Sequence, residues 1–551
     1  MKKITFAFLL LVLCGMNLHA QNKIDKLNLT YGVELPDDKQ KIVKIIGETG
    51  DKIYALAISG KNDFFLKIFE SQSMKMISSN PIVIPKHDDK EVDFEEIFLL
   101  NDNLYAIGSV YNRKEKIFNL IGASISDKGV LSEKTTLLFN SVVAKKSERG
   151  MFYFKLSPDE STLLVMHTSL FPKEDAVKYE VKLIDDKLNV LFANAEKVKF
   201  DDSKKDYEFT ISDFEVNFQN DVFLVINESY RDSKQKEQIE KFQIHTFKNS
   251  NSYKKEVVDV DIKGKEIINC KMISTSKNTL KIVGFYSSVR DNGKGNKDLK
   301  GVYNATIDLG TNTAKEVKFE EFDYETKVKL IGERRAKKGK DIKPLYSITT
   351  LIEKEDGGLI VLSELQYVVV GRSSGIGPLA FTPVTYVKNE IIITSLKPDG
   401  SLDWSNVLPK EQVASIVTMS LSLGFIAGNG SFTVGASMMI PLVDLGKGPE
   451  YMGAIPIYRD GELNLIFNDN VKNKGVTDIE KIKALGNYNN AVPSLFIFDN
   501  KGGMIRKDPE QVIENELVLR PGVYFRKKKD ELILYSSRKK QDKLGRLFLE
   551  K

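Results

Sequence analysis

Apolar and polar residues alternate along almost the whole chain, in runs of five to eight residues that end at Gly, Asn, Asp or Ser. A period of two is typical of half-buried β-strands, and these end residues favour turns. The sequence therefore predicts an all-β protein made of many short antiparallel strands.

One strongly apolar strand, introduced by a turn residue, recurs eight times, and its first five copies begin roughly 50 to 60 residues apart. The eight copies begin at Asp51, Asn103, Ser161, Asp221, Asn278, Gly358, Glu462 and Asp530. Three weaker strands surround each copy; in the third unit they are expected at Met151 to Leu156, Tyr179 to Ile184 and Val190 to Ala193. Repeated four-stranded antiparallel units indicate the blades of a β-propeller, which bury one another when they close into a ring.

The count of recurring strands favours eight blades over seven. The last unit has no fourth strand of its own, and the segment Leu27 to Leu35 is a free strand that can supply it. We therefore predict that the ring is closed by the N-terminal strand. The rival architecture, a pair of smaller β domains, is disfavoured because no linker separates the halves of the chain.

The first twenty residues have the pattern of a secretory signal peptide. Lys2 and Lys3 precede an apolar run from Ile4 to Leu13, and Ala20 offers a small residue at the cleavage site. A lipoprotein cut before Cys14 is disfavoured because Leu13 stands where a small residue is needed. We expect an exported protein, located in the periplasm, at the outer-membrane surface or outside the cell, with residues 21–551 as one propeller domain.

Composition narrows the classes of partner and chemistry. The formal net charge is +5 over 551 residues, so nucleic-acid binding has no overall electrostatic driving force. No later stretch is long and apolar enough for a transmembrane helix, although peripheral membrane association stays open. Cys270 is the single cysteine after Ala20, and its apolar neighbours predict a buried, inert thiol.

Long helices are not expected. The segments Glu411 to Leu421 and Asp478 to Ala484 are each predicted to hold a helical turn or two.

Two resemblances support the fold and the compartment. The turn Ser157-Pro158-Asp159-Glu160 resembles the Ser-Pro-Asp-Gly turn of WD40-like secreted propeller repeats. The second half resembles a family of uncharacterised exported proteins of Bacteroidota-type bacteria, over the segments 301–308, 356–367, 397–404 and 466–473. That family carries no assigned reaction, so the resemblance transfers no catalytic residue.

No catalytic residue is predicted. His87, His167 and His245 are widely spaced and form no metal-ligand pair. The segment Gly332 to Asp341 lacks the spacing and the Ser/Thr of a phosphate-binding loop. Glu364, at the end of a buried strand, is the one carboxylate singled out for a catalytic or ligand role.

Calcium is the metal with the most support, although no cofactor is otherwise predicted. Asn468, Asp469 and Asn470, with Asn473, place oxygen ligands in a loop directly after a strand. Asn and Asp also form ordinary turns, and the EF-hand spacing is absent.

Long loops carry the candidate binding residues. Loops that join second to third strands should lie on one face of the ring, and several are basic, as at 231–241 and 290–300. Two insertions, 366–389 and 425–458, are instead rich in aromatic residues and methionine, which are favoured at partner surfaces. The candidates are Tyr367, Arg372, Phe381, Tyr386, Met438, Met439 and Tyr451. The alternative is that these insertions fold back and cap the central channel.

The function hypothesis is an exported, non-catalytic propeller that binds or scaffolds an envelope protein or glycan. The alternative is a propeller hydrolase or lyase that uses carboxylates in the channel to act on a polysaccharide or a peptide.

Overall fold

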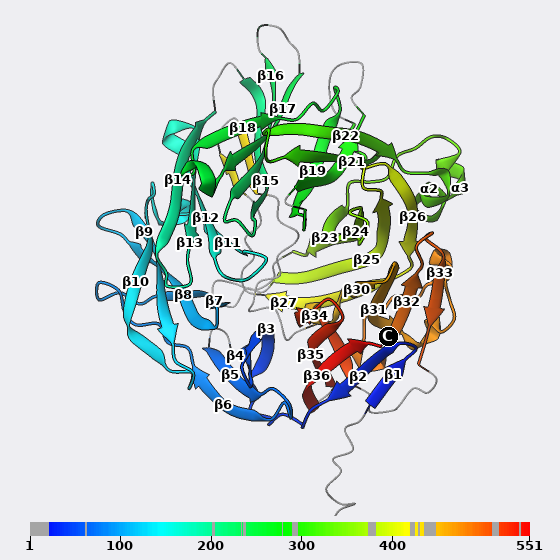
Figure 1. Ribbon diagram of the computed structural model, residues 1–551, viewed down its shortest axis with the longest axis horizontal. Coiled ribbons are helices and arrows are strands. Elements are labelled where there is room, and N and C mark those ends of the chain that lie inside the picture. The colour runs from blue at the N-terminus through cyan, green and yellow to red at the C-terminus, as the bar shows by residue number, and fades with distance from the viewer. Residues whose placement is uncertain are drawn as a thin grey trace, which may run out of the picture.

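The computed structural model describes residues 21–60, 63–200, 204–232, 234, 238–277, 279–288, 296–372, 382–418, 425–427, 430–434, 448–509, 517–538 and 541–550. The predicted signal peptide and Phe381, Met438 and Met439 lie outside these residues. The described strands form eight sheets arranged in a ring (Figure 1), each with a core of four antiparallel strands. The protein is an eight-bladed β-propeller, as the strand count predicted.

Each of the first four blades follows the chain from its inner to its outer strand. Blade 1 contains β3 (Lys41–Thr49), β4 (Lys52–Ser59), β5 (Asp63–Glu70) and β6 (Met76–Pro81). Blade 2 contains β7 (Asp93–Leu100), β8 (Asn103–Asn112), β9 (Ile117–Ile125) and β10 (Leu131–Val142). Blade 3 contains β11 (Met151–Leu156), β12 (Leu163–Phe171), β13 (Ala176–Ile184) and β14 (Val190–Lys199). Blade 4 contains β15 (Lys204–Val216), β16 (Val222–Asp232), β17 (Gln238–Phe247) and β18 (Lys255–Asp259).

The next three blades repeat this plan with insertions. Blade 5 contains β19 (Glu266–Ser274), β20 (Leu280–Ser287), β21 (Gly301–Asp308) and β22 (Thr313–Glu321), and two short helices follow, α2 (Tyr324–Ile331) and α3 (Glu333–Ala336). Blade 6 contains β23 (Tyr346–Glu353), β24 (Leu359–Val370), β25 (Thr382–Leu396) and β26 (Leu402–Leu408). Between blades 6 and 7 come β27 (Gln412–Thr418), β28 (Phe425–Ala427), β29 (Gly430–Val434) and the 3₁₀ turn η6 (Pro449–Tyr451). Blade 7 contains β30 (Ala454–Arg459), β31 (Glu462–Asn470), β32 (Ala491–Phe498) and β33 (Met504–Lys507).

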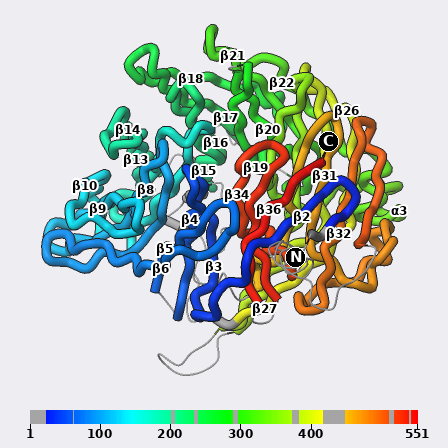
Figure 2. Tube along the Cα trace, turned by 60° about the horizontal axis from the view of Figure 1, so that its bottom comes forward, coloured from blue at the N-terminus to red at the C-terminus, as the bar shows by residue number. Residues whose placement is uncertain are grey.

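Blade 8 joins the two ends of the described chain. It contains β34 (Val518–Lys528), β35 (Glu531–Arg538) and β36 (Gln541–Leu549), and its fourth strand is β2 (Leu27–Tyr31). The register pairs Leu27 with Leu549 and Tyr31 with Gly545, and β1 (Gln21–Ile24) adds outside β2. Figure 2 shows β2 beside β36. The predicted closure by the N-terminal strand is confirmed.

The recurring apolar strand of the sequence is the second strand of every blade, namely β4, β8, β12, β16, β20, β24, β31 and β35. These strands are buried on both faces because each lies between two neighbours of its own sheet and between two adjacent blades. Eight apolar clusters each join two neighbouring blades around the ring. Cys270 lies buried between blades 4 and 5, so the predicted burial of its thiol is confirmed, and this burial raises the thiol pKa to about 12.

One of the two predicted helical segments is wrong. Residues 412–418 form the strand β27, because their backbone pairs with an extension of β25. The second segment does contain a 3₁₀ turn, η8 (Ile479–Lys481); the other such turns are η1 (Lys146–Glu148), η2 (Pro172–Glu174), η3 (Asn249–Asn251), η7 (Val471–Asn473) and η9 (Tyr488–Asn490). Within the described ranges, no helix has the length and apolar character to cross a membrane.

Glu240 gives the contact between blades 4 and 5 a pH dependence. Its Oε1 accepts hydrogen bonds from Ile267 N–H at 3.0 Å and Asn227 Nδ2 at 3.1 Å. Burial raises the pKa of this carboxyl to about 7, above the value of about 4.3 in an unfolded chain. The unfolded state therefore releases this proton first as the pH rises, and the contribution to stability falls between about pH 4.3 and pH 7.

We expect Glu240→Gln, which keeps the acceptor oxygen, to remove this decline. The variant should be more stable than the parent protein at pH 8 and about equal or less stable at pH 4. The difference in the free energy of unfolding between the variant and the parent should change by at most about 1.4 kcal/mol per pH unit between about pH 4.3 and pH 7. Chemical denaturation across this range checks the prediction, and parallel stability profiles for the two proteins would contradict it.

Candidate functional site

The two faces of the ring differ in their connections. The loops that join second to third strands, and the links between blades, leave from one face, which we call the loop face; the short turns between first and second strands lie on the other, the turn face. The predicted assignment of the long loops holds, because β8–β9, β16–β17, β20–β21, β24–β25 and β35–β36 are all second-to-third connections. The first insertion thus belongs to the loop face.

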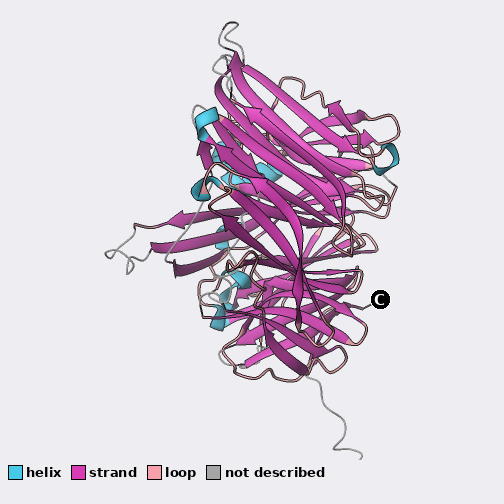
Figure 3. Ribbon diagram, turned by 90° about the vertical axis from the view of Figure 1, so that its left-hand side faces the viewer, coloured by secondary structure: helices cyan, strands magenta, loops and turns pink. Residues whose placement is uncertain are grey.

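On the loop face, β24 and β25 continue beyond blade 6 as a three-stranded sheet. Residues 366–370 of β24 pair with 384–388 of β25, and residues 382–388 of β25 pair in turn with 412–418 of β27. We call this sheet the β24 extension. Since β23 pairs with β24 only as far as Leu365, this sheet continues beyond blade 6. The side view of Figure 3 shows a group of strands that projects from the disc.

The β24 extension has one buried and one exposed face. Tyr386, Val384, Ala414, Ile416 and Met452 form a buried cluster on one face, with Val368 and Tyr488 packed against it. Tyr367 and Val369 lie on the other face and are 37% and 51% exposed, and Val370 is 44% exposed at the strand end. Of the residues predicted to contact a partner, Tyr367 and Arg372 are thus exposed, whereas Tyr386 is a core residue.

The second insertion crosses the ring. Its strand β29 pairs in parallel with β15, the inner strand of blade 4, and matches Gly430 to Tyr207 and Val434 to Ile211. The yellow strands beside β15 in Figure 1 lie away from β27, the strand that precedes the insertion. The described parts of the insertion therefore fold back onto the ring, as the capping alternative expected.

Tyr451, at the end of this insertion, makes structural contacts. Its hydroxyl lies 2.7 Å from Ser537 Oγ and accepts from Arg520 Nη2 at 2.9 Å, and its ring stacks on Tyr488 at 5.1 Å. Arg520 also pairs with the buried Glu450 at 3.1 Å. These contacts attach the return of the insertion to blade 8.

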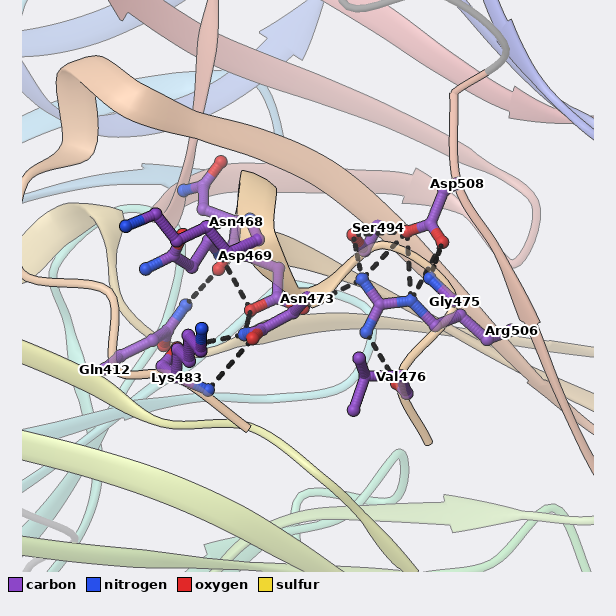
Figure 4. A network of polar contacts seen from close by, with 12 residues as sticks. Gln412, Asn468, Asp469, Asn473, Gly475, Val476, Lys483, Ser494, Arg506 and Asp508 are labelled. Atoms are coloured by element: carbon purple, nitrogen blue, oxygen red, sulfur yellow. Dashed lines mark hydrogen bonds and ion pairs between the residues drawn. The ribbon is translucent and has the colours of Figure 1, made fainter. Parts of the chain in front are cut away.

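Asn468, Asp469 and Asn473 form a buried network with protein partners (Figure 4). Asn468 Nδ2 donates to the carbonyl oxygens of Tyr451 and Leu519, and Gln412 Nε2 donates to Asn468 O at 2.8 Å. Asn473 Nδ2 donates to Asp469 Oδ1 at 2.7 Å, so the loop after β31 is held from within. Asn470 Nδ2 donates to Ala484 O at the far side of the same loop.

A cation already occupies the acidic position of this network. Arg506 Nη2 lies 3.0 Å from Asp469 Oδ2 and 2.8 Å from Asp508 Oδ1, and its side chain is buried. A guanidinium beside Asp469 opposes a second cation by Coulomb repulsion. The side-chain amides of the asparagines form hydrogen bonds with backbone groups of the protein. Among the described residues, no group of three or more His, Cys, Asp or Glu is placed to hold a metal. The arrangement favours the turn alternative over the calcium site.

Glu364 belongs to a second buried ion pair, at the base of the β24 extension. Its Oε1 lies 2.9 Å from Lys410 Nζ, which also donates to Lys388 O at 2.8 Å and to Gln412 Oε1 at 3.1 Å. Burial lowers the pKa of Lys410, although the carboxylate of Glu364 opposes this effect. The pair links β24 to the segment between β26 and β27, so the geometry gives Glu364 a structural partner.

Sequence reasoning missed the cations that complete these clusters, Lys410, Arg506 and Arg520. Lys410 is far in sequence from its partner Glu364, Arg506 is far from Asp469, and Arg520 is far from Glu450. The separations run from 37 to 70 residues, so no local pattern joins the two members of a pair. The one local signal was an isolated charge in an apolar context, at Arg520 after Leu517-Val518-Leu519.

No protein-family model matches the sequence, and no curated protein matches it. Solved structures of similar fold include a europium-containing methanol dehydrogenase, with 9% identity, 95% of this chain and 93% of that chain covered, and a TM-score of 0.40. They also include the Dos1 propeller (8% identity, 95% of each chain, TM-score 0.37) and a quinohemoprotein alcohol dehydrogenase from Pseudomonas putida (8% identity, 97% and 77%, TM-score 0.35). Likenesses at this level bear on neither ligand nor reaction, and the assignment as a propeller rests on the strand pairing of this chain.

Proposed function

We propose that this propeller is an exported, non-catalytic binding or scaffold protein that engages a protein of the cell envelope through its loop face. The observation that carries the proposal is the β24 extension, which continues beyond blade 6 and exposes Tyr367, Val369 and Val370. Exposed apolar and aromatic side chains on a projecting sheet are typical of protein–protein contacts. The signal-like sequence of residues 1–20 supports the exported location.

The sheet favours a protein partner over a glycan. Its exposed face presents apolar side chains, together with the hydroxyls of Thr385 and Ser415, which bond to each other at 3.0 Å. Carboxylates and amides that would accept and donate to sugar hydroxyls are not on this face among the described residues. The face therefore has the chemistry of an interface and lacks that of a sugar subsite.

Polar replacement of the exposed face tests the proposal. We expect the double variant Tyr367→Ser/Val369→Thr to lose its partner when the tagged protein is cross-linked and recovered from whole envelopes. Because both side chains point to solvent, the ring should keep its melting temperature within about 2 °C. Mass spectrometry of the recovered material, quantified against the unmodified protein, gives the result.

A matched control replaces exposed apolar residues elsewhere on the ring. Val83 and Ile505 are 72% and 58% exposed on outer strands or just after them, and Val83→Thr/Ile505→Thr should recover the partner fully. Equal recovery by both double variants, or cross-links confined to lysines of the turn face, would contradict the proposed interface.

A further inference from the structure

Where β24 leaves blade 6, one of its edges is open. Up to Leu365 the neighbour on that side is β23, whose pairing with β24 begins at Tyr346. The Gln366 N–H still donates to Leu345 O at 3.0 Å. Beyond this point, no strand in the described part of the chain pairs with β24 on this side.

The backbone groups at this edge have a definite direction. In an antiparallel ladder, successive residues direct their N–H and C=O groups to opposite sides. Gln366 directs its N–H away from β25, whereas Gly371 N donates toward β25, to Pro383 O. Since the register of residues 366–370 is unbroken, Val368 and Val370 direct their N–H and C=O groups toward the open edge.

The usual protections of an edge strand are missing here. Exposed edges are normally blunted by lysine, by proline or by a bulge, because their free backbone groups are a template for another strand. Residues 366–371 contain no charge and no proline, and the bulge in this strand comes earlier, between Glu364 and Gln366. The edge is therefore competent to accept a strand.

A pocket of about 290 Å³ lies at the base of this edge. Leu330 and Ile331 of α2, with Leu345 and Leu365, give it an apolar lining, and Leu345 and Leu365 flank the point where β23 stops pairing. An added strand that continues the line of β23 along residues 366–370 reaches this pocket at one end. The pocket's lining of leucine and isoleucine side chains suits an apolar side chain of that strand.

The unpaired charges at the rim of the pocket are positive. Arg335 and Lys343 are exposed at its rim, and no carboxylate of the described residues lies within ion-pairing distance of either. The one lining carboxylate, Glu390, already accepts a hydrogen bond from the Tyr346 hydroxyl. The rim therefore favours an acidic group on the incoming segment.

We propose that the open edge of β24 accepts an extended segment of the partner protein as an added strand, with an apolar side chain in the pocket and an acidic group beside Arg335 and Lys343. This inference rests on the proposed function and specifies its binding mode, which is β-strand addition. A second copy of this chain is disfavoured, because antiparallel pairing of two β24 edges brings Arg372 of one copy toward Arg335 and Lys343 of the other.

Two variants test the two components of this binding mode. Val370→Pro removes an N–H that points to the open edge and bonds to no neighbour among the described residues, so it should block strand addition while the sheet persists. Arg335→Glu/Lys343→Glu reverses the charge of the pocket rim. A display library of random twelve-residue peptides is selected on the unmodified protein, and the enriched peptides are then titrated against each variant.

The enriched peptides should alternate apolar residues and carry an acidic residue near one end. Their affinity should fall at least about tenfold for each variant, since each removes roughly 1.4 kcal/mol or more of binding free energy. Val83→Pro and Lys128→Glu/Lys134→Glu introduce the same residue types at exposed positions of blades 1 and 2, away from the edge and the pocket, and they should bind as the parent does. Enriched peptides that bind Val370→Pro as tightly as the parent protein would overturn the proposal. Dimerisation of the chain through this edge, measured by analytical ultracentrifugation, would overturn it as well.

The envelope capture separates this inference from the proposed function. A partner recovered equally by the parent protein and by Val370→Pro, but lost with Tyr367→Ser/Val369→Thr, would reject strand addition and leave the loop-face interface standing. Recovery of no partner by the parent protein would reject the proposed function itself.

Discussion

Lys410→Met is expected to destabilise the protein by about 3–5 kcal/mol, the usual cost of leaving a buried charge without its partner. Lys410 is fully buried and Glu364 is 4% exposed, and their charged groups lie 2.9 Å apart. Without Lys410, the nearest cation to Glu364 is Lys388 Nζ, at 3.8 Å from its carboxylate. Chemical denaturation followed by the fluorescence of Trp404, the one tryptophan of the chain, measures the change.

The double variant Lys410→Met/Glu364→Gln should recover at least half of this loss, because it removes the second charge as well. Lys388→Met is the matched control; its ammonium is part-exposed and farther from Glu364, so the expected loss is below about 1 kcal/mol. A loss below about 1 kcal/mol for Lys410→Met would show that the pair does not hold the segment before β27 to blade 6. If the double variant were fully stable but lost an enzymatic activity, that result would instead support a catalytic role for Glu364.

Leu27→Asp is expected to open the ring at blade 8, with a loss of at least about 4 kcal/mol. Leu27 is 1% exposed and packs among Leu547, Leu549, Ile455 and Ile457, which gives a carboxylate no partner. Because β2 is the outer strand of blade 8, its release exposes the free edge of β36. Denaturation and limited proteolysis near residue 31 should both report the change.

Val33→Asp is the control for this variant, since Val33 follows β2 directly and is 44% exposed. We expect it to alter stability by less than about 0.5 kcal/mol. Equal stability of the two aspartate variants would mean that the ring closes without β2.

The ring was predictable from sequence because its determinants are local and repeated. Each second strand is apolar on both faces, as in Asp221-Val-Phe-Leu-Val-Ile, and each begins at a turn residue, so the blade count follows from a count of such strands. The role of the N-terminal strand also followed, because the last unit was short by one strand. Both inferences needed only the period and the order of elements.

The arrangement on the loop face was not predictable in the same way. Residues 412–418 alternate buried Gln412, Ala414 and Ile416 with Val413 and Ser415, but five positions cannot separate a short strand from helical turns when the pairing partner is unknown. That partner is an extension of β25 beyond its own blade. Likewise, Asn468, Asp469 and Asn470 were predicted as metal ligands in a loop, whereas they are the last residues of β31 and pair with β32. They looked like ligands until Arg506 and the backbone carbonyls were placed beside them. Tyr386 looked like Tyr367 in sequence, and only the register of β24 with β25, which pairs Tyr386 with Val368 and Tyr367 with Val387, places them on opposite faces.

The most direct test of the account is hydrogen exchange of the protein alone and in the complex recovered from envelopes. Exchange is followed by mass spectrometry on peptides that cover residues 335–346 and 366–372. The account predicts that the partner slows amide exchange at Val368 and Val370 and around Lys343 to Leu345, while the turn face is unchanged. Protection confined to the turn face, with residues 366–372 exchanging as in the free protein, would contradict it.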